Sequence, residues 1–347
     1  MSGPKGYSSY RGRGPRWKIA VIVVLVLVIA AAAAVIFLQK YIVYDDSGTP
    51  HLQLPEKQTE EPAASGAASS GGDLNITIDK PAAPAELQAV QLSQTPLTDW
   101  AAAQTELAGH TAAVVTVKDA QGAVYYDSAA ARAVSPSAVK AQSTTAAAVA
   151  ALTGSDVYAV ARLSCLRDPV AAKADVDAMG LKNTGGYIFY DANNENWLDP
   201  SKQATQDYLC ALVKECAAMG FDEILLTDLT FPTEGKLNKI AYPETGTQAA
   251  IDSLLTAVSG ALKDYPDVKL SVELPAAVIT TGSDQTAGLV LSDIAASVSR
   301  IFAVTAPEGV SALSAAVEAA GTADNTPAFV PEVTEAGELT GYVLVKS

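Results

Sequence analysis

Four acidic residues stand where apolar, strand-like runs of the chain end, namely Asp119, Asp168, Asp228 and Glu273. In α/β folds, ligands meet the carboxyl ends of the strands, so these side chains are candidates for acid, base or nucleophile chemistry. Two carboxyl groups across one glycosidic bond can hydrolyse it. They lie about 5 to 5.5 Å apart when the configuration is retained and about 6.5 to 9.5 Å apart when it is inverted.

Each of these acids also has a structural interpretation. Asp168 precedes Pro169 and is placed to cap a helix, while Asp119 is placed to begin the turn at Gly122. Glu273 is placed to pair with a cation on a neighbouring strand. The sequence leaves both interpretations open.

Three further residues are candidates for contact with a substrate. Arg162 lies within an apolar run, where it would neutralise a buried acid or help to line a sugar pocket. Trp197 could stack on a sugar ring or pack beneath the irregular segment that precedes it. Thr227 ends the apolar run Ile224–Leu226 and, with Asp228, marks the strand end at which chemistry is expected first.

The clearest positioning unit is a helix followed at once by a strand. Pro200–Met219 carries apolar residues at three- and four-residue steps, which predicts one buried stripe. Asp199 is expected to cap this helix, with Pro200 in the first helical position and Gly220 just past the end. A buried strand is predicted at Glu223–Leu226.

Eight such strands, most of them separated by helical patterns, are predicted after residue 86. They are Leu87–Leu92, Ala112–Val117, Val157–Leu163, Glu223–Leu226, Val268–Leu274, Ile301–Thr305, Ala328–Val333 and Tyr342–Val345. Further helices are predicted at Leu97–Leu107, Pro136–Leu152 and Gln248–Tyr265. This count favours a (β/α)8 TIM barrel over residues 86–347, rather than an open doubly wound sheet.

The N-terminal part has a different composition. Ile19–Leu38 contains neither a charge nor a proline and is long enough to cross a bilayer, which predicts a transmembrane helix over 19–40. The basic tail 1–18 before it places the N-terminus in the cytoplasm and the remainder outside the cell membrane. A cleaved signal peptide is the alternative interpretation. Residues 41–85 are predicted to be a flexible, disordered linker because Pro, Ala, Ser, Gly and acids dominate much of the segment.

Charge and metal-ligand patterns exclude several classes of partner. The chain of 347 residues has a net charge of −15, and its first eighteen residues hold five Lys or Arg and no acid. The rest therefore carries about −20, which argues against nucleic acid as a partner. His51 and His110 lie far apart in the sequence, and no Cys-x-x-Cys spacing occurs, so we expect no metal site and no cofactor. The three cysteines are expected to be unpaired thiols.

Four motifs occur in order along the chain, namely Val114–Asp119 with Gly122, Tyr158–Pro169, Trp197–Pro200 and Gly220–Pro232. Together they resemble the putative glycoside hydrolase domain family of bacterial surface proteins, a TIM barrel related to the α-amylase-like clan. The resemblance extends over roughly residues 87 to 280. It implies carbohydrate as the partner, and it assigns Asp228 and Glu273, after the fourth and fifth strands, to the nucleophile and the acid/base.

The chain departs from the family pattern at three positions. The family usually has Asp where this chain has Thr116 and Thr227, and Arg where it has Thr230. A threonine cannot replace a carboxylate at the anomeric carbon. Asp228 lies one residue further along and can serve only if the strand has ended before it. Two functions follow from the sequence, a membrane-anchored glycoside hydrolase or a degenerate barrel that binds glycan.

Overall fold

The structure, a computed structural model, describes residues 42–44, 50–52 and 83–345. The chain divides into two compact units, Met1–Ile76 and Thr77–Ser347. In the first unit, β1 (Ile42–Tyr44) pairs antiparallel with β2 (Pro50–Leu52), so part of the predicted linker forms a short hairpin.

The predicted basic tail, the predicted membrane helix and the rest of the predicted linker lie outside the described residues. Within the described part of the chain, no helix combines the length and the apolarity that a membrane span requires.

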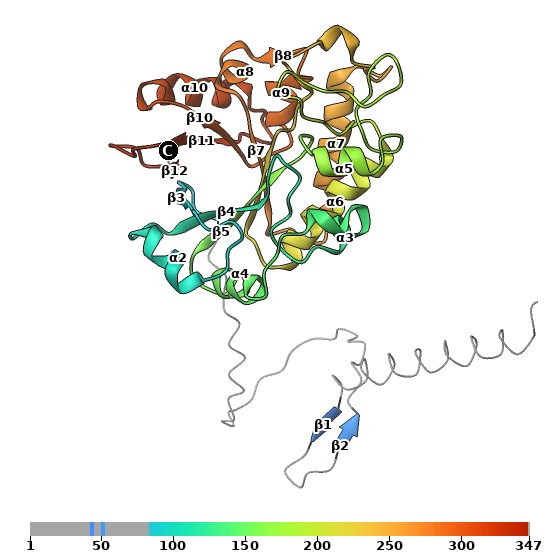
Figure 1. Ribbon diagram of the computed structural model, residues 1–347. Helices are drawn as coiled ribbons and strands as arrows, with labels where there is room; N and C mark the ends of the chain where they lie inside the picture. The colour runs from blue at the N-terminus through green and yellow to red at the C-terminus, as the bar shows by residue number, and fades with distance from the viewer. Residues whose placement is uncertain (1–41, 45–49, 53–82, 346–347) are drawn as a thin grey trace, which may run out of the picture. The chain divides into compact units, whose positions relative to one another are not determined.

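The second unit is a closed barrel of eight parallel strands, which confirms the predicted architecture (Figure 1). The strands are β3 (Gln88–Gln91), β4 (Ala112–Lys118), β5 (Tyr158–Ser164), β6 (Glu223–Thr227), β7 (Lys269–Glu273), β10 (Arg300–Val304), β11 (Ala328–Val333) and β12 (Tyr342–Leu344). Each strand pairs with the next one in this order. The last strand closes on the first, where Val343 lies opposite Ala89.

Helices and a small hairpin connect the strands. The connections contain α2 (Trp100–Leu107), α3 (Ala129–Val134), η1 (Pro136–Ala138), α4 (Thr145–Thr153), α5 (Pro169–Ala174), α6 (Gln203–Ala218), η2 (Leu237–Lys239), α7 (Thr247–Ala261), α8 (Ala276–Thr281), β8 (Ser283–Asp284), β9 (Leu289–Val290), α9 (Leu291–Ala295), η3 (Pro307–Gly309) and α10 (Val310–Ala320). The described connection between β11 and β12 contains no helix. The seventh β/α unit therefore lacks its helix.

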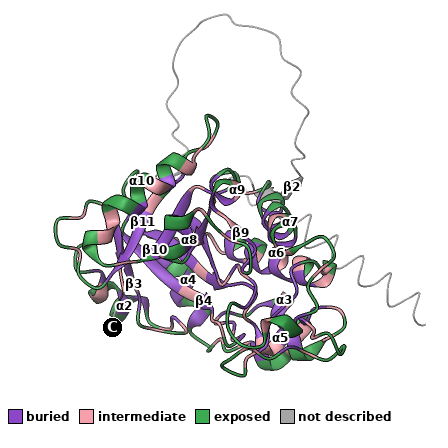
Figure 2. Cartoon of the chain, turned by 90° about the horizontal axis from the view of Figure 1, so that it is seen from above, coloured by how far each residue is buried: buried purple, intermediate pink, exposed green. Residues whose placement is uncertain are grey.

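Alternation along the strands divides the core into two parts. Every second residue faces the barrel interior, where Val160, Leu225 and Phe302 belong to a fully buried cluster. Their strand neighbours, such as Ile224 and Leu226, pack outward in the larger cluster that includes the apolar stripe of the helices. Figure 2 shows the result, with buried residues concentrated on the strands and exposed residues on the outer surface of the helices.

Helix α6 begins three residues later than predicted. Asp199 does not cap it, because its Oδ1 instead accepts hydrogen bonds from the backbone N–H of Ser201 at 3.0 Å and from the Ser201 hydroxyl at 2.6 Å. These bonds form a turn that contains Pro200. The predicted C-terminal signal is correct, since Gly220 adopts a positive φ of 92° just past the helix.

The single helix predicted over Pro136–Leu152 is wrong. The chain forms η1, then an extended segment, and only then α4. Val124 explains the break, because its N–H donates to Ala138 O at 2.8 Å and its carbonyl accepts from Lys140 N–H at 2.7 Å. This pairing with a segment earlier in the chain holds Val139 in an extended conformation.

Candidate active site

Asp228 leaves the strand direction at the carboxyl end of β6. The strand ends at Thr227, and Asp228 has a positive φ of 49°, a conformation that aspartate tolerates better than most residues. Ser164 Oγ donates to Asp228 Oδ2 at 2.7 Å, and Leu166 N–H donates to the Asp228 carbonyl at 3.1 Å. The condition that the strand must end before Asp228 is therefore met.

Glu273 is the last residue of β7 and pairs with a partly buried cation. Its Oε2 accepts from Arg162 of β5, and the same guanidinium donates to Oε1 of Glu332 on β11. The Glu273 side chain is 24% exposed, whereas that of Glu332 is only 1% exposed. Arg162 thus bridges two carboxylates at the top of the barrel interior, as expected of a strand arginine that neutralises a buried acid.

The charges around Arg162 do not balance, because this one cation lies near the carboxyl groups of Glu273, Glu332 and Asp228. Burial raises the pKa of Glu273 to about 7, the Glu332 charge adds to the increase, Arg162 opposes it, and Asp228 raises it further. Burial alone would lower the pKa of Arg162, but the two glutamates and Asp228 outweigh this effect and raise it. The site therefore contains a carboxyl group that can hold a proton near neutral pH.

A cavity of about 180 Å³ brings the two predicted catalytic residues together. It is lined by Asp228 and Glu273, and also by residues that follow β6 and β7 and by Val304 at the end of β10. Thr230, one of the three uncharged departures, lines it as well. Side chains that carry a carboxyl group, at the ends of two consecutive strands, therefore line one cavity.

Asp168 and Asp119 have structural partners. Asp168 is fully buried, caps α5 through Ala171 N–H at 2.8 Å, and pairs with Lys118 at 3.1 Å. Asp119 accepts from the backbone N–H groups of residues 121 and 123 at 2.9 Å and from Tyr125 OH at 2.6 Å. Neither aspartate is among the residues that line the Asp228–Glu273 cavity. Asp168 is therefore a helix cap, and Asp119 begins a turn.

Thr227 and Trp197 lie beside the site rather than in its cavity. Thr227 is 7% exposed, and its Oγ1 donates to Asp228 Oδ2 at 3.4 Å. Trp197 is 8% exposed, and its indole N–H donates to Asp191 Oδ2 at 2.9 Å. Trp197 therefore packs beneath the irregular segment and orients Asp191, in agreement with the packing alternative.

Glu332 is the principal residue that the sequence reasoning did not identify. Its Oε2 is buried and has no hydrogen-bond partner among the described residues. It lies inside the predicted strand Ala328–Val333, two positions after the inward-facing Val330. The two-residue period of the strand would have indicated an acid facing the interior.

The part of the chain that the structure describes contains neither a metal-binding cluster nor a disulfide. No group of three or more His, Cys, Asp or Glu side chains is arranged there to hold a metal ion. Cys165 and Cys216 are buried free thiols, and Cys210 is a partly buried one. Burial raises the pKa of Cys165 and of Cys216 to about 12, so both stay protonated.

Comparison with known proteins gives one family. The sequence pattern of the family described as "Putative glycosyl hydrolase domain" matches residues 93–326, more than half of the chain. No curated protein gives a significant match.

Three examples stand for the solved structures that are similar to the chain. A hypothetical protein from Ruminiclostridium thermocellum ATCC 27405 is 28% identical, with a TM-score of 0.41, over 47% of this chain and 82% of that one. A chitinase from Chromobacterium violaceum ATCC 12472 is 16% identical, with a TM-score of 0.36, over 65% of this chain and 57% of that one. A variant of the glycoside hydrolase domain of PelA from Pseudomonas aeruginosa is 15% identical, with a TM-score of 0.36, over 64% of this chain and 67% of that one.

Proposed function

The chain belongs to the family of putative glycosyl hydrolase domains, and from this premise we propose that it hydrolyses glycosidic bonds with Glu273 as general acid and Asp228 as the partner carboxylate. The observation that supports this most directly is their shared cavity at the carboxyl end of the barrel, where the pKa of Glu273 is raised to about 7. A general acid works best when its pKa lies near the working pH.

The proposed step transfers one proton and breaks one bond. Glu273 donates its proton to the glycosidic oxygen as the bond from that oxygen to the anomeric carbon breaks. Asp228 either attacks that carbon or takes a proton from the attacking water, depending on the separation of the two carboxyl groups. Arg162 then stabilises the glutamate anion that remains, because it already contacts that carboxyl group.

The proposed setting is the outer face of a cell membrane. The apolar segment Ile19–Leu38, with its basic flank, would anchor the chain with the N-terminus in the cytoplasm. The barrel would then meet a cell-wall or environmental glycan. Protease added to intact cells with a permeable wall should release a fragment that begins within residues 45–85. Protection of the whole barrel would reverse the proposed orientation.

Product release from a panel of wall and plant glycans tests the reaction. The full-length chain in detergent micelles should release reducing sugar, and Glu273→Gln should lower turnover by about 10² to 10⁴ while leaving binding largely intact. Asp228→Asn should lower turnover as well. Glu338→Gln, at an exposed glutamate outside the site, is the matched control. Turnover that Glu273→Gln does not affect would overturn the residue assignment.

A catalytically inactive, glycan-binding barrel is the second candidate. Its specific support is the end of β6, where uncharged Thr227 occupies the strand position and the only carboxylate comes from the residue after it. In that case the wild type should bind a glycan without cleaving it. Thr227→Asp should then restore weak turnover by returning a carboxylate to the strand end. Any turnover by the wild type excludes this candidate.

A further inference from the structure

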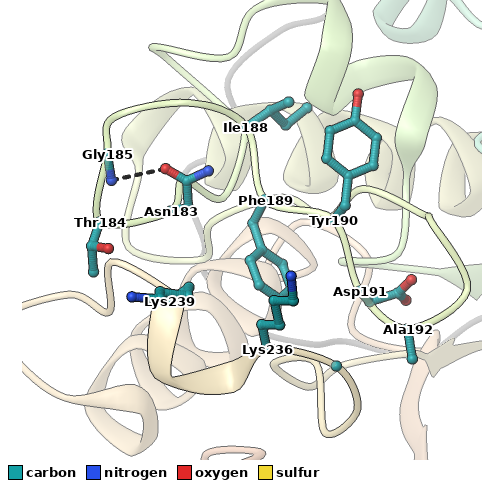
Figure 3. A pocket seen from close by; sticks show the side chains of 11 residues that line it. Asn183, Thr184, Gly185, Ile188, Phe189, Tyr190, Asp191, Ala192, Lys236 and Lys239 are labelled. Atoms are coloured by element: carbon teal, nitrogen blue, oxygen red, sulfur yellow. Dashed lines mark hydrogen bonds between the residues drawn. The ribbon is translucent and has the colours of Figure 1, made fainter.

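A second and larger pocket lies among the loops at the carboxyl ends of β5 and β6. Its volume is about 650 Å³, and we call it the lysine pocket because Lys236 and Lys239 line it. Asn183, Phe189 and Tyr190 line it from the long segment between α5 and α6. Figure 3 shows these side chains, with the two lysines on one loop and the others on the facing segment.

Backbone contacts between the two segments hold the pocket in shape. Thr184 N–H donates to Lys239 O at 2.8 Å, and Ala241 N–H donates to Lys182 O at 2.9 Å. Gly235 has a positive φ of 102°, and a Cβ there would lie 2.8 Å from Ala192 N. Only glycine allows the two loops to approach this closely, so the pocket is formed before any ligand binds.

Two lysines give this pocket a cationic wall on an acidic protein. Lys236 and Lys239 are both exposed, and neither forms an ion pair with another described residue. The whole chain carries a net charge of −15, so a pair of unpaired cations at one hollow is a local exception. Ammonium groups in this setting attract a carboxylate or a phosphate.

Asp191 also lines the pocket, but its charge is already engaged. Its Oδ1 accepts from the N–H groups of residues 193 and 195, both at 2.9 Å, and its Oδ2 accepts from Trp197 Nε1 at 2.9 Å. Arg167 is close enough for the Asp191 charge to contribute to its raised pKa, after the larger effect of its bond to Glu195. Among the charged residues that line the pocket, two lysines outnumber this one aspartate, so the lining keeps a net positive charge.

Aromatic side chains supply the apolar part of the wall. Phe189 is 3% exposed, and Tyr190 is 45% exposed. In Figure 3 the Lys236 side chain overlaps the Phe189 ring in this view, and Tyr190 lies further from both lysines. An aromatic face and an ammonium group in one pocket suit a ring that is apolar on one side and charged at its edge.

The lysine pocket and the catalytic cavity share one loop. Thr230 lines the cavity and Gly235 lines the pocket, and five residues of chain span at most about 18 Å. Arg167 lies near both sites. Its pKa is raised first by Glu195, and then by the charges of Asp228, which lines the cavity, and Asp191, which lines the pocket. A chain molecule bound in the cavity can therefore extend into the pocket.

We propose that the lysine pocket holds an anionic sugar residue of the same glycan chain whose scissile bond lies between Glu273 and Asp228, an inference that rests on the proposed function. The two ammonium groups bind the carboxylate or phosphate of that residue. Tyr190 contacts the face of its ring. The substrate class is thus an acidic glycan.

Calorimetric binding of three oligosaccharides of equal length tests this, using the full-length chain in detergent micelles. The probes are an oligogalacturonate, its carboxyl-reduced neutral counterpart, and a hexose oligomer phosphorylated at C6. The wild type should bind an anionic probe about tenfold more tightly than the neutral one, as two exposed charge pairs would give. The anion that shows this preference identifies carboxylate or phosphate as the natural group.

Charge reversal identifies the lysines. Lys236→Glu combined with Lys239→Glu should abolish the preference for the anionic probe, so that the anionic probe binds no more tightly than the neutral one. Lys263→Glu, at an exposed lysine after α7, should retain the preference. Equal binding of anionic and neutral probes by the wild type, or an unchanged preference in the double variant, would overturn the proposal.

The two proposals fail in different ways. Binding that depends on the lysines, without turnover of any glycan, would refute the hydrolase and keep the anion subsite. Turnover that depends on Glu273, combined with equal binding of anionic and neutral probes by the wild type, would refute the subsite and keep the hydrolase.

Discussion

The barrel interior contains two charged clusters, one at each end, and they are built differently. At the amino end, Arg300 of β10 pairs with Glu223 of β6, and the other Glu223 oxygen accepts from Ser271 Oγ at 2.5 Å. Tyr158 OH also donates to Glu223, at 2.9 Å, and Arg300 donates a further bond to Pro84 O. One cation meets one carboxylate, and the Arg300 and Glu223 side chains are 6% and 0% exposed.

At the carboxyl end, one cation serves several acids. Arg162 contacts Glu273 and Glu332, and Asp228 adds a third negative charge nearby. One Glu332 oxygen has no partner among the described residues. This cluster borders a cavity, whereas the amino-end cluster is closed. The amino-end cluster joins strands in the closed interior, whereas the carboxyl-end cluster contains Glu273, whose pKa is raised to about 7.

The largest expected effect comes from the apolar layer between the clusters. Leu225 is fully buried in the barrel interior, opposite Arg162 on β5 and Ser271 on β7 in the strand register. Leu225→Asp would place an unpaired charge there, and we expect the free energy of unfolding to fall by about 5 kcal/mol or more. Chemical denaturation measures the loss.

Val304→Asp is the matched control for that substitution. It is also an apolar-to-acid change on a barrel strand, but Val304 is 61% exposed at the open end. We expect a change of about 0.5 kcal/mol or less. If the free energy of unfolding fell by similar amounts in the two variants, the Leu225 layer would not be a buried apolar layer between the clusters.

The next largest effect comes from breaking the closed pair. Glu223→Gln leaves Arg300 buried without its anion, and we expect a loss of about 3 to 5 kcal/mol in the free energy of unfolding. Glu332→Gln removes an equally buried acid, but Arg162 keeps its contact with Glu273. The Glu332 variant should therefore be the more stable of the two in urea. The reverse order would refute the distinction between the clusters.

A smaller effect appears as a pH dependence. The raised pKa of Glu273 means that the folded state keeps this proton to higher pH than the unfolded chain does. Its contribution to stability is therefore fully present below about pH 4.5 and is lost as the pH rises through about 7, by at most about 3 kcal/mol.

Glu273→Gln should remove that part of the pH dependence. Unfolding free energies of the wild type and the variant, measured from pH 4 to pH 8, should diverge in favour of the variant as the pH rises. Glu338→Gln provides the comparison at an exposed glutamate. A pH profile of the Glu273 variant that runs parallel to that of the wild type would contradict the raised pKa.

The strands were predictable because local signals and tertiary structure agree there. The run Ala328–Val333 is both apolar and paired on two sides, and its predicted bounds equal the observed ones. Over Pro136–Leu152 the local pattern favoured a helix, but pairing of Val124 with residues 138 and 140 prevailed. Such a contact between segments distant in sequence leaves no trace in either segment alone.

The residues of the candidate site could be predicted from the sequence better than the contacts between them. The strand-end position of Glu273 and the buried setting of Arg162 could be read from apolar runs. That one arginine is shared by Glu273 and Glu332 depends on which strands meet across the barrel, and the backbone turn at Asp228 depends on bonds from Ser164 and Leu166. The sequence of a single strand determines neither the shared arginine nor the turn at Asp228.

The smallest effect adds one more charge to the open cluster. Thr227 Oγ1 lies 3.4 Å from Asp228 Oδ2, so Thr227→Asp places a new carboxylate at the cavity end of β6. A fourth acid near the single Arg162 should raise the pKa of Glu273 by about one further unit. In an active enzyme, the alkaline limb of the pH profile of kcat/KM should move upward by the same amount, because Glu273 acts in its protonated form. Thr227→Asn keeps the shape without the charge and should leave the limb in place. A limb that moves equally in both variants would show that packing, rather than charge, determines the proton affinity of this cluster.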